Sequence, residues 1–173
     1  MTDPPTDDQL LRSLAGADGR AMRSLIDRHG PYLYGVARTL TRSETEAEDA
    51  VQETLMALLK ATYDGRSSVR TFMVSILVRQ AALLRRKRRG WLRIVSDPPE
   101  SAGDANEQHA VDARLDLASL LDRLSPEHRE VIVMRELEGM SYDRLSQELG
   151  IARGTVESRL HRAREQLREA WKR

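Results

Sequence analysis

Apolar residues recur every three or four positions through the first half of the chain, a spacing typical of helices that bury one face. A short helix is expected to open at Asp7 and Asp8, and a longer one to end at Leu40. The His-Gly-Pro step at residues 29–31 should bend or break the longer helix, because proline lacks an amide hydrogen and crowds the preceding turn.

Two further helices are predicted before residue 92. Ser43 is the expected N-cap of the first, and Glu46 three residues later completes a capping box. The second begins at Val69, and Gly90 is expected to end it. The polar residues of the first of these helices lie off its apolar stripe and should face outward: Asp49, Gln52, Glu53 and Lys60.

The second half of the chain has the same helical character. Residues 111–124 form an amphipathic stretch, and Ser125-Pro126 is a strong start for a helix that runs to Glu138. Ser141 should cap a short helix that Gly150 terminates. A last helix starts near Arg153 or Gly154 and carries the apolar stripe Val156, Leu160, Ala163, Leu167 and Trp171.

Between the halves, residues 96–106 are rich in proline, glycine, serine and aspartate. Few apolar side chains are available there to offset the entropy cost of ordering, so we expect a flexible linker. The predicted fold class is all-α, with two small helical domains joined by that linker. The expected limits are residues 7–92 for the first domain, 93–109 for an acidic linker, and 110–173 for the second domain.

The net charge of +1 hides an uneven distribution of charge. Five consecutive basic residues occupy positions 85–89, and residues 153–173 carry seven basic residues against three acids. The stretch between them, residues 96–117, carries six acids and one arginine. Two basic regions separated by an acidic connector suggest two anion-binding surfaces on one tether.

Several classes of function find no support. The chain has no cysteine, which excludes disulfides, thiolate catalysis and cysteine-zinc sites. Its acidic, proline-rich start is unlike a secretory signal, and the apolar run at residues 73–78 is too short for a bilayer. We therefore expect a cytoplasmic protein without membrane insertion. Catalytic motifs are missing and the four histidines are scattered, so we expect no enzyme activity, cofactor, metal or small-molecule substrate.

A short helix, a tight turn at residues 150–152 and a longer basic helix form a predicted helix-turn-helix. In this motif the second helix enters the major groove, where its first turns reach base edges. A helical hairpin with a solvated charged face would explain the same pattern equally well. The candidate DNA contacts are the polar residues that avoid the apolar stripe: Arg153, Thr155, Glu157, Ser158, Arg159 and Arg162.

Three segments of the second half read LSPEHREV at 124–131, EGMSY at 138–142 and GTVESRLHRAR at 154–164. In wording and spacing they resemble the region-four domain of extracytoplasmic-function (ECF, group 4) sigma factors of the sigma-70 family. The resemblance implies binding of the promoter minus-thirty-five element. Helix-turn-helix output domains of response regulators share part of this pattern, so the second half alone does not decide between them.

The first half supplies an independent match. EAEDAVQETL at 46–55 resembles the sigma region-two helix that docks on the clamp helices of the largest RNA polymerase subunit. The resemblance implies core polymerase as a partner and Asp49, Gln52 and Glu53 as docking residues. An acidic outward face could meet a basic helical pair, although an ordinary solvated face would look the same.

The loop at residues 63–69 and the helix at 71–89 occupy the family's promoter-melting position. In the family, that loop captures a base flipped from the non-template strand, and the helix reads the minus-ten element. For each residue a plain surface role is the alternative, although five successive charges favour a phosphate partner. The resemblance implies these minus-ten contacts: Tyr63, Arg66, Ser67, Ser68, Phe72, Arg79, Gln80, Arg85, Arg86 and Arg88.

Three positions depart from the family pattern. Phe72 stands where the family usually has tryptophan, Arg79 stands for an expected asparagine, and Leu83 stands for a polar residue. Arg79 and Gln80 could set a different minus-ten preference, or Arg79 could hold a phosphate. The usual minus-ten consensus is therefore not transferred to this chain.

Two other functions are compatible with parts of the sequence. A helix-turn-helix regulator that acts without polymerase would explain the second half and leave residues 46–55 and 63–89 unexplained. A sigma-like decoy would bind an anti-sigma factor and never support transcription. The family resemblance itself implies promoter DNA and an anti-sigma factor as partners of this chain.

Overall fold

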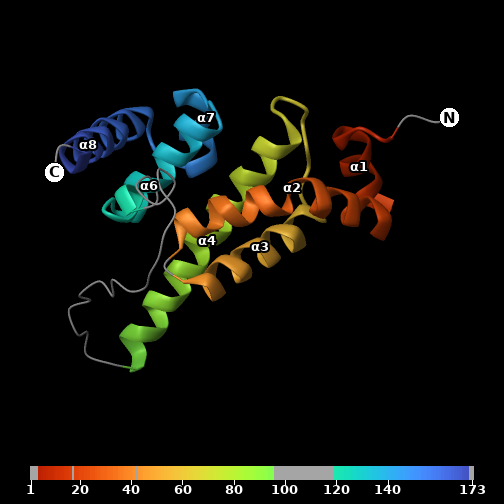
Figure 1. Ribbon diagram of the computed structural model, residues 1–173, viewed down its shortest axis with the longest axis horizontal. Helices are drawn as coiled ribbons and strands as arrows, with labels where there is room; N and C mark the ends of the chain where they lie inside the picture. The colour runs from red at the N-terminus through yellow and green to blue at the C-terminus, as the bar shows by residue number, and fades with distance from the viewer. Residues whose placement is uncertain (1–3, 17, 42, 96–118, 172–173) are drawn as a thin grey trace.

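The computed structural model describes residues 4–16, 18–41, 43–95 and 119–171, and the regular structure in these ranges is entirely helical, as predicted. Most of the predicted linker and the start of the amphipathic stretch, residues 96–118, lie outside the described residues. The helices of Figure 1 are α1 (Asp7–Ser13), the 3₁₀ turn η1 (Leu14–Gly16), α2 (Gly19–Leu40), α3 (Glu44–Leu58), α4 (Val69–Val95), α6 (Pro126–Ile132), the π-helical turn η2 (Val133–Leu137), α7 (Tyr142–Leu149) and α8 (Arg153–Trp171).

Side-chain caps determine where several of these helices begin. Ser43, Ser125 and Ser141 accept backbone hydrogen bonds at the starts of α3, α6 and α7, which confirms all three predicted N-caps. The cap of α1 is Thr6, which forms a reciprocal capping box with Gln9. Each cap contributes about 1 kcal/mol, because it satisfies a backbone N–H that lacks a partner within the helix.

The predicted break at residues 29–31 is wrong: α2 continues from Gly19 to Leu40 with Pro31 inside it. An internal proline removes one backbone hydrogen bond and crowds the carbonyl four residues earlier. Leu25, before the proline, and Leu33, after it, are both fully buried. Packing of this apolar face against α3 and α4 therefore outweighs the local cost.

The predicted stop at Gly90 is also wrong, because α4 runs on to Val95. Glycine inside a helix costs about 1 kcal/mol relative to alanine, which does not end a helix by itself. Gly139 and Gly150 follow helical segments and have φ values of 65° and 63°, the left-handed conformation typical of a helix end.

α4 is the central helix of the molecule. It packs against both α2 and α3, and residues 72–78 are all buried. A helix that is buried on every side needs neighbours on every side. The apolar run that is too short for a membrane is thus the middle of a helix enclosed by other helices.

The buried residues of the C-terminal half belong to the same apolar core as those of the N-terminal half. Val131 of α6, Leu145 of α7 and Val156 and Leu160 of α8 are buried, and α8 packs against both α6 and α7. This half contacts α2 through α6 and reaches α4 through ion pairs of Arg79 and Arg85, and α3 lies on the opposite side of α2 and α4 in Figure 1. The face of α3 that points outward is consequently not covered by the C-terminal helices.

Candidate nucleic-acid interface

The geometry of α7, the following turn and α8 is that of a helix-turn-helix. Gly150 takes the left-handed conformation after α7, and the hydroxyl of Ser146 donates a 2.6 Å hydrogen bond to the carbonyl oxygen of Ile151. The Ile151 N–H donates to the carbonyl oxygen of Ser146 at 3.2 Å. These contacts fix the angle at which α8 leaves the turn, and so the direction of its polar face.

The apolar stripe of α8 faces the core as predicted over most of its length. Val156, Leu160 and Ala163 are buried and Leu167 is partly buried, but Trp171 is 73% exposed. The stripe therefore ends at Leu167, near the end of the helix, where α6 and α7 no longer cover it.

The predicted DNA contacts of α8 lie on its other face. Glu157, Ser158 and Arg162 are exposed, whereas Thr155 and Arg159 are half-buried. Arg153 is exposed and forms ion pairs at 2.9 Å with Asp143 and 3.0 Å with Glu157. The hydrogen bonds and charges of these two carboxylates raise its pKa, so this guanidinium is held in place and fully charged.

The acidic face of α3 has the exposure that docking requires. Asp49, Gln52 and Glu53 are all exposed, and Met56 follows on the same helix at 61% exposure. Residues at spacings of three, four and seven share one side of a helix. Asp49, Gln52, Glu53 and Met56 therefore form one exposed stripe, with an apolar side chain beside three polar ones.

Glu46, at the first turn of α3, forms an ion pair with Arg88 of α4. Arg88 is thereby held near α3, although 61% of its side chain is exposed. The neighbouring Arg86 is exposed, so the basic end of α4 keeps positive charge at the surface.

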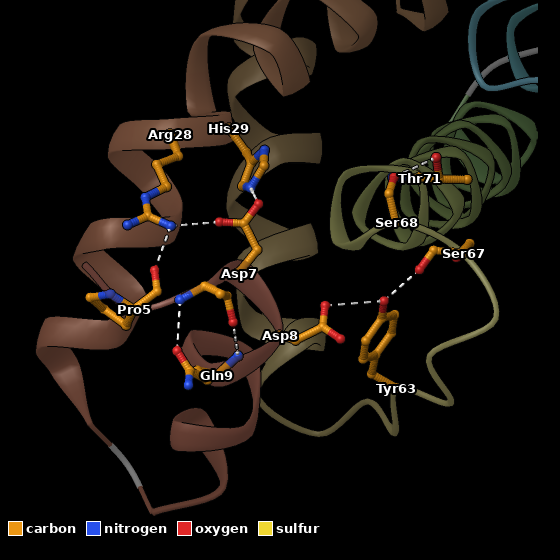
Figure 2. A network of polar contacts seen from close by, with 11 residues as sticks. Pro5, Asp7, Asp8, Gln9, Arg28, His29, Tyr63, Ser67, Ser68 and Thr71 are labelled. Carbon is orange, nitrogen blue, oxygen red and sulfur yellow. Dashed lines mark hydrogen bonds and ion pairs between the residues drawn. The ribbon is translucent and has the colours of Figure 1, made fainter. Parts of the chain in front are cut away.

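The loop between α3 and α4 is built around Tyr63, as Figure 2 shows. Its hydroxyl donates a short hydrogen bond to the carbonyl oxygen of Ser67, and Asp8 of α1 lies 3.5 Å from the same hydroxyl. Its ring packs on Phe72, with 5.1 Å between centroids. Phe72 is only 7% exposed, so it supports the loop from below.

Ser67 and Ser68 have different surroundings in this loop. The hydroxyl oxygen of Ser67 is buried and has no hydrogen-bond partner among the described residues. Ser68 is exposed, accepts from the Thr71 N–H at 3.1 Å and donates to the Thr71 hydroxyl at 2.9 Å. Arg66 is exposed and pairs with Asp64 at 3.3 Å. An unpaired buried hydroxyl costs free energy unless something else binds it.

A second network, absent from the sequence prediction, ties the N-terminal segment to α2 (Figure 2). Asp7 accepts from Arg28 and pairs with His29, each at 2.8 Å, and Arg28 also donates to the carbonyl oxygen of Pro5. Burial raises the pKa of Asp7, but the hydrogen bonds and charges of these two partners lower it further, to below its usual value. The chain before α1 is consequently anchored beside the loop that carries Tyr63.

The predicted minus-ten residues of α4 are brought against the C-terminal half. Arg79 forms a 3.0 Å ion pair with Glu148 of α7, and Arg85 forms a 2.8 Å ion pair with Glu130 of α6. Gln80 is half-buried. Local sequence pattern gives no sign of these pairs, because the partners are far apart along the chain.

Neither a group of metal-ligating side chains nor a helix long and apolar enough to span a membrane occurs in the described part of the chain. The distribution of exposed charge therefore carries the functional argument. A helical bundle with an exposed acidic helix, joined to a helix-turn-helix, defines a two-part DNA-binding transcription factor.

The sequence comparisons identify the family. Residues 25–91 match the family model for sigma-70 region 2, and residues 114–167 match that for sigma-70 region 4. The chain is 34% identical to the ECF RNA polymerase sigma factor SigE of Mycolicibacterium smegmatis, covering 90% of this chain but 64% of SigE. It is 33% identical to the RNA polymerase sigma factor NccH of Alcaligenes xylosoxydans xylosoxydans, covering 96% and 95% of the two chains.

Two solved structures are similar in fold and sequence. The sigma factor RpoE in complex with the anti-sigma factor NepR from Bartonella quintana aligns with a TM-score of 0.65 and 27% identity, covering 87% of this chain and 96% of RpoE. CnrH in complex with the cytosolic domain of CnrY aligns with a TM-score of 0.61 and 29% identity, covering 96% and 97%.

The chain therefore belongs to the ECF sigma factors of the sigma-70 family. It is a transcription initiation factor that directs RNA polymerase to promoters. The matches to both halves do not favour a regulator that has the helix-turn-helix alone.

Proposed function

We propose that this sigma factor binds core polymerase through α3, opens the minus-ten element with the Tyr63 loop and α4, and reads the minus-thirty-five element with α8. One observation carries the proposal: the exposed acidic stripe of α3 and the polar face of α8 belong to separate helical units of one chain. Polymerase would perform the chemistry in the cytoplasm, and this chain would act as a specificity factor, not as an enzyme.

The docking surface on α3 combines charge with an apolar anchor. Asp49 and Glu53 supply charges that can steer encounter with a basic partner, and Gln52 can form hydrogen bonds. Met56 supplies apolar area that is otherwise exposed to water. A helix on the largest polymerase subunit that carries basic and apolar residues would match both the carboxylates and Met56.

The minus-ten surface would use the loop as a pocket for one unstacked base. Extracting a base costs a few kcal/mol, and a polar pocket must recover that cost. The buried hydroxyl of Ser67 is a hydrogen-bonding group without a partner among the described residues, and Arg66 and Ser68 are exposed beside it. Phe72 would hold Tyr63 in place, while Arg86 and Arg88 would bind phosphates of the same strand.

The minus-thirty-five surface would be the first turns of α8. Arg153 is ordered by Asp143 and Glu157 and would position the helix on a phosphate. Arg159 and Arg162, about two turns or more beyond Arg153, would read bases or hold phosphates. Thr155 and Ser158 lie between Arg153 and Arg159.

Regulation by an anti-sigma factor is part of the same proposal. The related RpoE and CnrH are each seen in a complex, with NepR and with CnrY respectively. Because 87% and 96% of this chain align with those two sigma factors, an anti-sigma partner would meet similar surfaces here.

The test is run-off transcription with bacterial core polymerase on fragmented genomic DNA, with and without this protein. New RNA start sites should appear only when both components are present, and they should share two spaced upstream motifs. The absence of new starts while core binding is intact would instead indicate a sigma-like decoy. The absence of core binding would indicate a DNA-binding regulator that acts alone.

A further inference from the structure

Glu138, directly after the π-helical turn, reaches across to the N-terminal half. Its carboxylate accepts hydrogen bonds from the hydroxyls of Tyr32, at 2.6 Å, and Thr71, at 2.8 Å. Arg70 lies 4.8 Å from the centre of the Tyr32 ring. Burial and the bond to Glu138 raise the pKa of Tyr32 to about 12, although Arg70 opposes the shift, so the hydroxyl stays a donor.

Two arginines of α4 also donate to carboxylates of the C-terminal half. Glu148 accepts a 3.0 Å hydrogen bond from Arg79, and Glu130 forms a 2.8 Å ion pair with Arg85. Glu127 lies 4.0 Å from the second terminal nitrogen of Arg85. In each of these contacts the C-terminal half supplies the carboxylate, and α4 supplies the donor.

In two other contacts the C-terminal half supplies the donor. Arg129 donates a 2.9 Å hydrogen bond to the carbonyl oxygen of Thr39 at the end of α2, and Arg144 lies 3.8 Å from Asp64 in the loop. Neither involves α4. They attach the C-terminal half to α2 and to the loop.

The face of α4 between these pairs is closed to water. Ser75 and Val78 lie one and two turns beyond Thr71 on the same side of the helix, and both are at most 1% exposed. Arg85 lies on this side too, so the contacts of Glu138 with Thr71 and of Glu130 with Arg85 hold the C-terminal half at both ends of this stretch of α4.

We propose that the C-terminal half masks the minus-ten surface of its own chain, with Glu130, Glu138 and Glu148 in place of DNA phosphates. The proposal rests on the proposed function of α4. It adds Tyr32 and Thr71 to the strand-binding surface, as a hydroxyl pair that holds a phosphodiester oxygen when Glu138 has moved away.

A phosphodiester fits the donors that these carboxylates occupy. Hydroxyl and guanidinium groups are the usual ligands of DNA phosphates, and an anionic oxygen is what each donor now binds. A hollow lined by Asp7, Arg28, His29, Tyr32, Ser68 and Arg70 lies beside Tyr32, one of the two donors that Glu138 binds. Because a phosphodiester oxygen would need the same Tyr32 and Thr71 hydroxyls, its binding there and the Glu138 contact would be mutually exclusive.

The experiment compares two variants of the full chain that each lose two negative charges. Glu138→Gln with Glu148→Gln removes two masking carboxylates. Glu165→Gln with Glu169→Gln removes two exposed carboxylates of α8 and is the matched control. The probe is a fluorescein-labelled 20-nucleotide single-stranded DNA of random sequence, titrated at about 0.1 M salt and followed by anisotropy.

Unmasking should tighten DNA binding on the order of fivefold for the first pair, with little change for the control. Adding Tyr32→Phe and Thr71→Val to the first pair should remove much of that gain. Equal affinities for all variants, or equal gains in both pairs, would overturn the masking proposal. Thermal unfolding followed by circular dichroism checks that each variant is folded.

A distance measurement gives an independent readout. The chain has no cysteine, so Lys60→Cys in the N-terminal half and Arg168→Cys in α8 can carry a fluorescent dye pair without other changes. Energy transfer should fall in the Glu138→Gln, Glu148→Gln protein and not in the control. Identical transfer in both would show that these carboxylates do not hold the halves together.

The two proposals fail in different ways. If the sigma assignment of these surfaces is wrong, the unaltered protein gives no polymerase-dependent starts in run-off transcription. If only the masking is wrong, those starts appear, but DNA affinity and energy transfer are the same in the Glu138→Gln, Glu148→Gln protein as in the control.

Discussion

Asp49 is the exposed carboxylate at the N-terminal end of the acidic stripe of α3. Asp49→Arg should weaken binding to core polymerase by about tenfold or more, because a like charge would face the basic partner. Titration of labelled protein with core polymerase measures the affinity. Asp27→Arg, at an exposed acid on α2, is the charge-matched control, and equal affinities for the two variants would remove α3 from the docking surface.

Arg159 and Arg162 belong to the polar face of α8. Replacing either with alanine should weaken binding of the holoenzyme to promoter duplex by about 1–3 kcal/mol, while core affinity persists. Electrophoretic mobility shift with a promoter mapped by run-off transcription measures promoter affinity. Titration of labelled protein with core polymerase measures core affinity. Unchanged promoter affinity in both variants would contradict the assignment of α8 as the recognition helix.

The ionisation of Asp7 should affect the stability of the folded protein in acid. Its partners Arg28 and His29 lower its pKa, so the ionised carboxylate stabilises the folded state above its usual value of 3.8 and this stabilisation is lost as pH falls through the lowered pKa. Asp7→Asn should therefore lose stability at neutral pH and show a shallower decline in acid.

Urea unfolding at a series of pH values measures this difference. Asp27→Asn, whose carboxylate is exposed on α2, is the control. Parallel stability curves for the Asp7→Asn and unaltered proteins would show that the Asp7 network does not stabilise the fold.

At the scale of the helix, local signals predicted starts better than interruptions. The three serine caps were correct because each cap depends on contacts within one turn of the chain. The breaks predicted from Pro31 and Gly90 were wrong because the local free-energy cost of either residue is small compared with the stabilisation from burying a helix face. The π-helical geometry at Val133–Leu137 has no recognised signature in the sequence.

Gly150 shows where a glycine does determine an element. Its φ of 63° is unfavourable for a side chain, although open space surrounds its α-carbon. Gly150→Ala should destabilise the C-terminal half by about 1 kcal/mol through the backbone alone. Gly154→Ala, inside α8 with similar open space, should be neutral or stabilising by a comparable amount.

Thermal unfolding of the two alanine variants makes the comparison. Because both substitutions add the same methyl group to an open site, a difference between them reports the backbone conformation. Equal stability would mean that the turn of the helix-turn-helix does not require the left-handed conformation.

At the scale of the whole molecule, the sequence predicted the two halves but not their contact. Periodicity identifies the buried face of a helix and leaves open which element covers it. Tyr32 and Glu138 are 106 residues apart, and each alone resembles an ordinary surface residue. The apolar run at residues 73–78, interrupted by Ser75, indicates that α4 has neighbours on several sides but does not identify them.

The placement of α3 has its own meaning in this arrangement. α3 lies on the side of the bundle away from the C-terminal half in Figure 1, and Asp49, Gln52 and Glu53 are exposed while the halves are in contact. Under the proposed function, core polymerase would therefore engage the N-terminal half before the minus-ten surface is free. Docking would come first and strand capture second.

If the carboxylate–donor pairs mask the minus-ten surface as proposed, dissolved salt acts on the protein in two opposing ways. Ions screen the contact between the halves, and they also weaken attraction to a DNA strand. Low salt would favour the closed arrangement, and high salt would favour an open arrangement with low affinity for DNA. Binding of a DNA strand should consequently be strongest at an intermediate salt concentration. The ionic strength around the protein would then set how readily it binds the strand.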